Sequence, residues 1–313
     1  MFEDLLTRCT LCPRRCKANR SAGARGLCGA GASARVARAA LHFWEEPPVS
    51  GEAGSGTVFF SNCPLHCVYC QNFSIANGRA GADVSIGRLA AIFLELQSQG
   101  ALNVNLVTAT HYAPHVVEAL HRARAAGLRI PAVWNTSGYE TVETLRLVKD
   151  DIAVYLTDLR YACPETARRY SAAPDYPDAA RAALAAMALT DADIIVRILA
   201  LPGCLDEAKE NVRFVHETYG ERVKLSLMSQ YTPVRTLPDH PELARRVEAF
   251  EYEALLDFAD SIGCEDYFWQ DGAAAEESFI PDFDALEGVL GEELPEECPD
   301  SRPSLGNGFF SIA

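Results

Sequence analysis

The stretch SNCPLHCVYCQN, at residues 61–72, follows directly on the apolar run TVFF at residues 57–60. Its three cysteines, Cys63, Cys67 and Cys70, have the spacing C-x3-C-x2-C. Because a four-iron cluster is normally held by four cysteines, a compact triplet suggests a cluster that leaves one iron open to a small molecule. Open coordination positions belong to catalytic metal sites and closed ones to structural sites. The alternative is a zinc or structural site that takes a distant fourth cysteine.

Short apolar runs alternate with longer amphipathic stretches from this loop onward. The runs expected to form strands lie at residues 57–60, 103–108, 130–134, 152–157, 194–199 and 223–227, with a last short strand at 266–269. The stretches between them have the apolar spacing of helices. Strands that alternate with helices form parallel βαβ units with right-handed crossovers. We therefore predict an α/β fold, a partial TIM-like (β/α)6 barrel, with an open doubly wound sheet as the alternative.

Charge is distributed unevenly along the 313 residues. Residues 1–40 carry seven arginines and one lysine against two acidic residues, whereas residues 264–313 carry thirteen acidic residues and one arginine. We expect three parts: a cysteine-rich head at 1–50, the barrel at 51–270, and an acidic C-terminal tail at 271–313. The tail has few apolar residues, so it should be poorly ordered or wrap over the surface.

The bulk composition excludes several classes of partner. The net charge of −15 argues against nucleic acid as a general partner. No apolar run is long enough to span a membrane, and the first residues lack the basic and apolar regions of a signal peptide. We therefore expect a cytoplasmic protein without a membrane partner. Eleven cysteines in that compartment are better explained as metal ligands or catalytic thiols than as disulfides.

Polar residues stand at the end of every expected strand. In a parallel barrel, functional groups collect at this carboxyl-terminal edge. The segments found there are 61–72, TATHY at 108–112, NTSGYE at 135–140, DLRY at 158–161, Arg197 with LPG at 201–203, and MSQY at 228–231.

The cysteine triplet, with Tyr69 directly before its last cysteine, resembles the signature of radical S-adenosylmethionine (SAM) enzymes. The wider sequence resembles the branch related to pyruvate formate-lyase activating enzyme. This similarity covers residues 9–270 and includes LCPR at 11–14, GSGT at 54–57, NTSGYE at 135–140 and LPG at 201–203.

The resemblance implies a [4Fe–4S] cluster on Cys63, Cys67 and Cys70, whose fourth iron chelates SAM. One-electron reduction would cleave SAM to a 5′-deoxyadenosyl radical, which abstracts hydrogen from a substrate. The protein would then be an oxidoreductase with a flavodoxin- or ferredoxin-type electron donor. One expectation is an activase that acts on a glycine of a partner glycyl-radical enzyme. A second is direct modification of a small molecule or peptide, and a third is a non-catalytic iron–sulfur or zinc protein.

The resemblance also assigns residues near the triplet and the second strand to SAM. Tyr69 stands where relatives place an aromatic ring near the adenine. Relatives end the second strand in Gly-Gly-Glu, which supports the amino group of SAM. This chain has Thr108, Thr110 and His111 in that region, so their hydroxyls and backbone carbonyls would take over the role.

Five further residues at later strand ends complete the SAM site expected from the resemblance. Asn135 and Ser137 could meet the ribose hydroxyls or the methionine carboxylate, because both hydrogen-bond without adding charge. Asp158 and Arg160 match an Asp-Leu-Lys block of relatives. Arg197 would point into the barrel towards an anionic partner, either SAM or, as a structural pair, Asp158.

Three features decide how far the resemblance carries. Relatives hold a monovalent cation near the cluster with the equivalents of Asn135, Thr136 and Asp158, which predicts such an ion here. Relatives that activate glycyl-radical enzymes often have a histidine after strand six, whereas this chain has Gln230 and Tyr231. The ferredoxin-like insert of many activases is also missing after the triplet.

A second group of cysteines stands in the head. Cys9, Cys12, Cys16 and Cys28 have the spacing C-x2-C-x3-C-x11-C. Four thiolates can close a site, and they suit zinc or an iron–sulfur cluster about equally. Structural zinc, an auxiliary cluster and free thiols therefore all remain open for the head.

Overall fold

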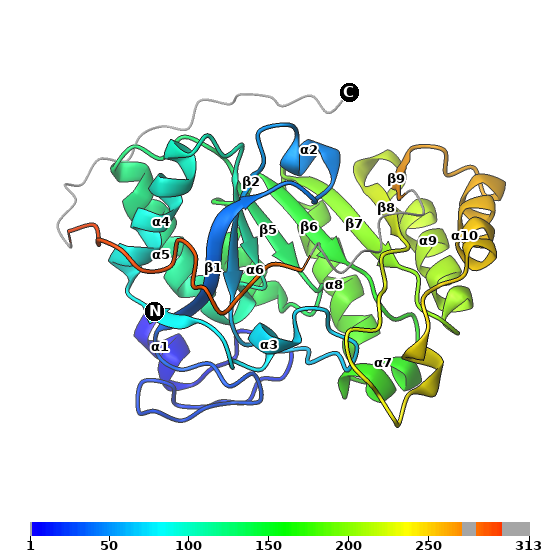
Figure 1. Ribbon diagram of the computed structural model, residues 1–313, viewed down its shortest axis with the longest axis horizontal. Helices are drawn as coiled ribbons and strands as arrows, with labels where there is room; N and C mark the ends of the chain where they lie inside the picture. Colours follow the sequence, from blue (N-terminus) through cyan, green and yellow to red (C-terminus); the bar gives the residue numbers. More distant parts are fainter. Residues whose placement is uncertain (1, 271–279, 296–313) are drawn as a thin grey trace.

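The computed structural model describes residues 2–270 and 280–295, and these form one curved sheet with helices along its outer side (Figure 1). Within this part of the chain the order of strands in the sheet is β3-β1-β2-β4-β5-β6-β7-β8-β9. The strands are β1 (Ala34–His42), β2 (Ser55–Phe60), β3 (Ala82–Val84), β4 (Val104–Val107), β5 (Ala132–Thr136), β6 (Val154–Asp158), β7 (Asp193–Leu199), β8 (Lys224–Met228) and β9 (Tyr267–Trp269).

The strands β2 and β4 to β9 run parallel, and each of them pairs with the next of these strands along the chain. This uninterrupted order is that of a barrel, whereas a doubly wound sheet would reverse its strand order once. In the described residues the edge strands β3 and β9 do not pair with each other, so the barrel stays open. The predicted α/β fold, a partial TIM-like barrel, is confirmed.

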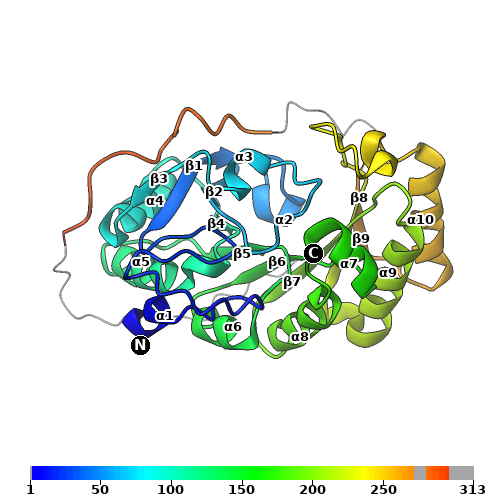
Figure 2. The ribbon, with the colours of Figure 1, turned by 90° about the horizontal axis from the view of Figure 1, so that it is seen from below.

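The longer helices lie along the outer face of the sheet, where α4 packs on α5, α5 on α6, α6 on α8, and α9 on α10 (Figure 2). None of the described helices is both long and apolar enough to cross a membrane. Their bounds are α1 (Phe2–Thr7), α2 (Pro47–Ser50), α3 (Phe73–Ala76), α4 (Ile86–Ser98), α5 (Ala113–Ala125), α6 (Val142–Val148), α7 (Pro164–Ser171), α8 (Tyr176–Ala188), α9 (Leu205–Tyr219) and α10 (Ala249–Ser261), with the 3₁₀ helices η1 (Thr110–Tyr112), η2 (Gly220–Arg222) and η3 (Pro241–Ala244).

Side-chain caps explain where some of these helices begin. The hydroxyl of Ser85 accepts a hydrogen bond from the backbone N–H of Arg88 at the start of α4. Thr141 caps α6 in the same way through the N–H of Thr144. A cap of this kind satisfies one of the N–H groups that the first turn of a helix leaves unpaired.

Two antiparallel strands extend the sheet beyond the predicted barrel units. β1 pairs antiparallel with β2, and β3 pairs antiparallel with β1. The sheet therefore continues across residue 50, the expected boundary between head and barrel. β1 carries Arg35 and Arg38 at half-buried positions, so its composition resembles that of the basic head more than that of a buried barrel strand.

The connection between β1 and β2 closes the amino-terminal end of the barrel. The end of β1 pairs with the start of β2, so this connection lies at the amino-terminal ends of the parallel strands. Its short helix α2 buries Val49 inside the barrel, against residues of β5, β6 and β7. These residues are Val133, Leu156 and Ile195. Apolar side chains of this kind form the packed layers inside parallel barrels, so the open space of the lumen lies towards the opposite end.

Residues 280–295 wrap over β1 and α4 (Figure 1). The backbone N–H of Ala39 donates to the carbonyl of Glu287 at 2.8 Å. The buried guanidinium of Arg88 donates to the carbonyl of Val289 at 2.9 Å, and the Val289 side chain is fully buried. This part of the expected tail therefore covers the surface. The remainder of the tail, at 271–279 and 296–313, lies outside the described residues.

Candidate functional site

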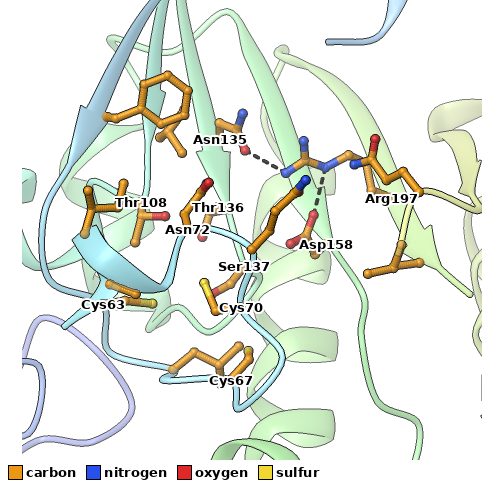
Figure 3. Close-up of a pocket in the computed structure, with 18 of the residues that line it drawn as sticks. Cys63, Cys67, Cys70, Asn72, Thr108, Asn135, Thr136, Ser137, Asp158 and Arg197 are labelled. Atoms are coloured by element: carbon orange, nitrogen blue, oxygen red, sulfur yellow. Dashed lines mark hydrogen bonds and ion pairs between the residues drawn. The ribbon is translucent and has the colours of Figure 1, made fainter. Parts of the chain in front are cut away.

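A pocket opens into the barrel at the carboxyl-terminal ends of its parallel strands (Figure 3). Its wall combines the cysteine loop, the strand ends, the connection after β1 and the start of the C-terminal segment. It brings together the three predicted cluster ligands and seven of the nine residues predicted to bind SAM. These ten residues are Cys63, Cys67, Cys70, Tyr69, Thr108, Asn135, Ser137, Asp158, Arg160 and Arg197.

The loop that carries the cysteine triplet is held by backbone hydrogen bonds at both ends. Asn62 and His66 have φ values of 70° and 58°. These left-handed conformations let the chain turn sharply directly before Cys63 and directly before Cys67. The N–H of Asn62 donates to the carbonyl of Ile75 at 2.7 Å, and the N–H of Val68 donates to that of Tyr170 at 2.8 Å. The three cysteine side chains consequently lie around the same end of the pocket (Figure 3).

The environment of the triplet is one in which thiolates need a cationic partner. Burial raises the pKa of Cys63 to about 11, and the charge of Cys67 adds to this rise. Burial raises the pKa of Cys70 to about 12, again with a contribution from Cys67. A bound metal removes the proton from a coordinating thiol outright. Three thiols that face one pocket therefore fit an iron–sulfur cluster, whose iron ions would stabilise the three cysteines as thiolates.

Arg160 is the cation that stands beside the triplet. Its Nη1 lies 3.7 Å from Sγ of Cys67, and its Nη2 donates to Asp158 at 2.5 Å. Its guanidinium carbon lies 5.9 Å from the centre of the Tyr69 ring. Arg160 therefore links three of the predicted site residues and places positive charge next to a cluster ligand.

Arg197 is held by three oxygen atoms from three different elements. Its Nε donates to Asp158 at 2.8 Å and its Nη2 to Asn135 at 2.7 Å (Figure 3). Its Nη1 donates to Glu45 at 3.2 Å. Burial raises the pKa of Asp158, but the charges of Arg197 and Arg160 outweigh burial, so this pKa lies below its ordinary value. The expected pair of Arg197 with Asp158 is therefore present.

Glu45 is a pocket residue that the sequence did not indicate. It lies in the connection between β1 and α2, and its Oε1 accepts hydrogen bonds from Asn105 and Asn135, each at 3.0 Å. Its neighbour Glu46 is buried, and burial raises the pKa of Glu46. The signal that could have found this pair is two adjacent acidic residues between the aromatic Phe43 and Trp44 and the prolines Pro47 and Pro48.

Thr110 and His111 do not line the pocket, in contrast to the expectation from the sequence. The chain turns into η1 after β4, which directs both side chains away from the lumen. The hydroxyl of Thr110 donates to Oε1 of Glu140 at 2.6 Å. Nε2 of His111 donates to the carbonyl of Ser61 at 3.0 Å, and burial lowers the pKa of His111 to about 3. His111 is therefore a neutral histidine of the core.

Thr108 remains at the pocket in a strained backbone conformation. Its φ of 60° lies in the left-handed region, which β-branched residues rarely adopt. Its N–H donates to the carbonyl of Asn135 at 2.8 Å, which ties it to the end of β5. Strained residues of this kind concentrate at functional sites. The resemblance placed Thr108 where relatives have glycine, the residue that adopts this conformation without strain.

The head packs on the triplet loop through Arg14. This guanidinium donates to the carbonyls of Pro64 and Leu65, at 3.1 and 3.3 Å, and to that of Ser171 at 2.8 Å. It also lies 5.3 Å from the centre of the Tyr139 ring. The head therefore supports the loop that carries the predicted cluster ligands.

The four cysteines of the head lie close to one another. Cys9, Cys12 and Cys28 are buried, and Cys16 is exposed. Burial raises the pKa of Cys12 to about 12, and the charges of the other three contribute to this rise. In the described part of the chain, no three His, Cys, Asp or Glu side chains are placed to hold a single metal ion. Zinc and an auxiliary cluster both remain predictions for the head.

The fold and the triplet together define a class of protein: open α/β barrels with three cysteines after the first parallel strand. The family model described as the Radical SAM superfamily matches residues 57–215, which is more than half of the chain. The chain belongs to the Radical SAM superfamily. Membership of this family implies an enzyme that uses a [4Fe–4S] cluster and SAM.

Individual relatives are more distant. The chain is 29% identical over 267 residues to an uncharacterized protein of Methanocaldococcus jannaschii, MJ0674, with coverage of 82% of this chain and 76% of that protein. It is similar to SuiB from Streptococcus suis bound to S-adenosylmethionine, at 12% identity and a TM-score of 0.47, covering 68% of this chain and 46% of SuiB. A radical SAM methyltransferase from Sphaerobacter thermophilus matches at 15% identity and a TM-score of 0.47, covering 69% of this chain and 66% of the methyltransferase. The chain thus spans less than half the length of SuiB.

Proposed function

We propose that this protein holds a [4Fe–4S] cluster on Cys63, Cys67 and Cys70 and uses it to take a hydrogen atom from a substrate in the barrel. The observation that carries the proposal is that these three thiols face the same pocket as Arg160 and the strained Thr108. When bound, the cluster supplies an electron that cleaves SAM reductively, and the radical so released removes the hydrogen atom. The protein would contribute binding, orientation and exclusion of water.

Polar groups around the pocket support a specific division of labour for SAM. We assign the adenine to the buried ring of Tyr69, and the methionine carboxylate to Arg160, whose planar donor fork matches a carboxylate. Asn135 and Ser137 would meet the ribose hydroxyls or the carboxylate. The left-handed backbone of Thr108 would present its carbonyl oxygen to the amino group.

For the substrate we favour a small molecule or short peptide that enters the lumen. Leu199 of β7 and Met228 of β8 line the pocket beyond Arg197, and the connection after β1 contributes Trp44 and Glu45. A lumen that α2 closes at the amino-terminal end of the barrel suits a substrate that is held inside it. Activation of a glycyl-radical enzyme, as in the pyruvate formate-lyase activating branch, remains the alternative proposal.

The electron donor is proposed to be a flavodoxin- or ferredoxin-type protein. The supporting observation is the excess of arginine in residues 1–40, in a chain whose net charge is otherwise strongly negative. Complementary charge steers association between proteins.

The two substrate proposals differ in what should stimulate SAM cleavage. Anaerobically reconstituted protein is incubated with SAM, dithionite and either the small-molecule and short-peptide fraction or the macromolecular fraction of a cell extract. We expect the first fraction to raise the yield of 5′-deoxyadenosine. Stimulation by the macromolecular fraction alone, with a glycyl-radical signal in the electron paramagnetic resonance spectrum, would instead establish an activase. A Cys63→Ala variant serves as the control and should respond to neither fraction.

A further inference from the structure

Three oxygen atoms surround the guanidinium of Arg197 inside the barrel. Glu45 from the connection after β1, Asn135 from β5 and Asp158 from β6 each accept from a different nitrogen of this guanidinium, namely Nη1, Nη2 and Nε, at 3.2, 2.7 and 2.8 Å. Carboxylate and amide oxygens are the ligands that hard cations prefer.

The oxygen atoms are positioned by contacts other than those to Arg197. The second oxygen of Glu45 accepts from the amides of Asn105 and Asn135. The second oxygen of Asp158 accepts from Arg160 at 2.5 Å. The carboxylates of Glu45 and Asp158 are only 10% and 12% exposed. Two carboxylates held together with so little water are costly without a cation between them.

The oxygens that would hold a free monovalent cation are therefore already used. Asn135 and Asp158, both expected in such a site, bind Arg197 instead. The hydroxyl of Thr136, the third expected ligand, donates to Glu140 at 2.6 Å and accepts from the N–H of Gly138 at 3.3 Å. The residues present do not fit the monovalent-cation site that the resemblance predicted, because a side chain of this protein fills its place.

We infer that Arg197 is a built-in cation of the barrel, which replaces a dissociable monovalent ion. The guanidinium neutralises Glu45 and Asp158 permanently, since it is tethered to β7 and cannot exchange with solvent. The folded protein accordingly has no requirement for potassium or sodium. The inference concerns the protein without its cofactors, so it stands or falls independently of the proposed reaction.

The first test compares cations at constant ionic strength. Thermal unfolding of the wild-type protein is followed in potassium chloride, sodium chloride and choline chloride. Choline serves as the reference because it is too large to take the place of a bound potassium or sodium ion. Since Arg197 already fills the site, the three salts should give the same Tm. A wild-type Tm that rises in potassium or sodium relative to choline would overturn the inference.

The second test removes the built-in cation and offers a free one. Arg197→Met leaves Glu45 without its cation and Asp158 with Arg160 alone, which should lower Tm in choline chloride by on the order of 10 °C. Potassium, sodium or millimolar guanidinium should restore a large part of this loss. The double variant Glu45→Gln with Arg197→Met removes one of the two charges, and its response to cations should be several-fold smaller.

The second test has two contradicting outcomes. If Arg197→Met unfolds at the same temperature in all of these salts, the oxygens do not form a cation site. If the variant fails to fold in choline chloride, its refolding yield is compared with and without potassium or guanidinium. A yield that rises with the cation supports the inference, and a yield that does not change overturns it.

Discussion

Thr108 shows how a single backbone angle marks the site. Its φ of 60° costs about 1–3 kcal/mol for a non-glycine residue. Thr108 nevertheless keeps its side chain at the pocket wall, at the end of β4. By contrast Thr110, two residues later, is bonded to Glu140 outside the pocket. Thr108 therefore combines a strained backbone with a position in the pocket wall. Substitution by glycine shows how much this strain changes the stability of the folded protein.

We predict that Thr108→Gly stabilises the folded protein by about 1 kcal/mol. Relief of the strain outweighs the greater backbone freedom that glycine has in the unfolded chain. Thr110→Gly is the matched control, and it should destabilise by about 1–2 kcal/mol because Glu140 loses a donor. Urea denaturation of both variants tests this. A Thr108→Gly variant as unstable as Thr110→Gly would show that Thr108 is not strained.

Glu140 gives a prediction for pH. Its carboxyl is buried, burial raises its pKa from 4.5 to about 6, and three donors lower it in part. The folded protein therefore binds this proton more tightly than the unfolded chain, so its contribution to stability falls as pH rises from about 4.5 through about 6. Glu140→Gln removes that loss.

The predicted result is a pH-dependent difference between the two proteins. The free energy of unfolding of Glu140→Gln, relative to wild type, should increase by on the order of 2 kcal/mol between about pH 4 and about pH 7. The buried histidines are common to both proteins, so their titration cancels in this comparison. A difference that stays constant with pH contradicts the assignment of a raised pKa to Glu140.

Whole elements explain what the sequence could and could not predict. The parallel strands β2 and β4 to β8 were predictable because each is a short apolar run in a chain where such runs alternate with amphipathic helices. The strand β1 was not, since its two arginines, Arg35 and Arg38, match the basic composition of the head. Glu45 was missed because it follows β1 and reaches the pocket only through the antiparallel pairing of β1 with β2.

The site residues show a similar division. Residues directly at strand ends, such as Asn135 and Asp158, were predictable because parallel strands bring their carboxyl ends together. Thr110 and His111 lie two and three residues past Thr108, where the 3₁₀ turn η1 decides which way a side chain points. The apolar periodicity of the sequence carries no information about that turn.

The C-terminal segment supplies a test at the scale of an element. Gly288 has a φ of 70°, and a Cβ there would lie 1.9 Å from the carbonyl oxygen of Ala39 on β1. Gly263, after α10, has a φ of 81° with nothing within 4 Å of such a Cβ. Alanine should strain the backbone similarly at both positions. Only Gly288→Ala should also push residues 280–295 away from β1.

We expect Gly288→Ala to be cleaved within residues 280–295 by a glutamate-specific protease at least several-fold faster than Gly263→Ala. The segment contains Glu287, Glu292 and Glu293, so cleavage can be mapped by mass spectrometry. Equal cleavage rates in the two variants would mean that the close approach to Ala39 does not hold the segment in place.

At the scale of the whole molecule, the two ends of the chain support a pocket that neither of them forms alone. The head holds the triplet loop through Arg14, and residues 280–295 cover β1, from which the chain continues to Glu45. The pocket then receives the cysteine loop from one side and the connection after β1 from the other. Family membership accounts for the barrel and the triplet, whereas Glu45 and its contact with Arg197 are features of this chain's own structure.

The central claim is that Cys63, Cys67 and Cys70 hold the cluster with which this protein cleaves SAM. The most direct measurement is anaerobic reconstitution, reduction by dithionite in the presence of SAM, and quantification of 5′-deoxyadenosine by mass spectrometry. The account predicts 5′-deoxyadenosine from the wild-type protein, and none, together with a loss of iron, from the variant in which all three cysteines are alanine. Absence of 5′-deoxyadenosine from the wild type, with full iron content in the triple variant, would contradict it.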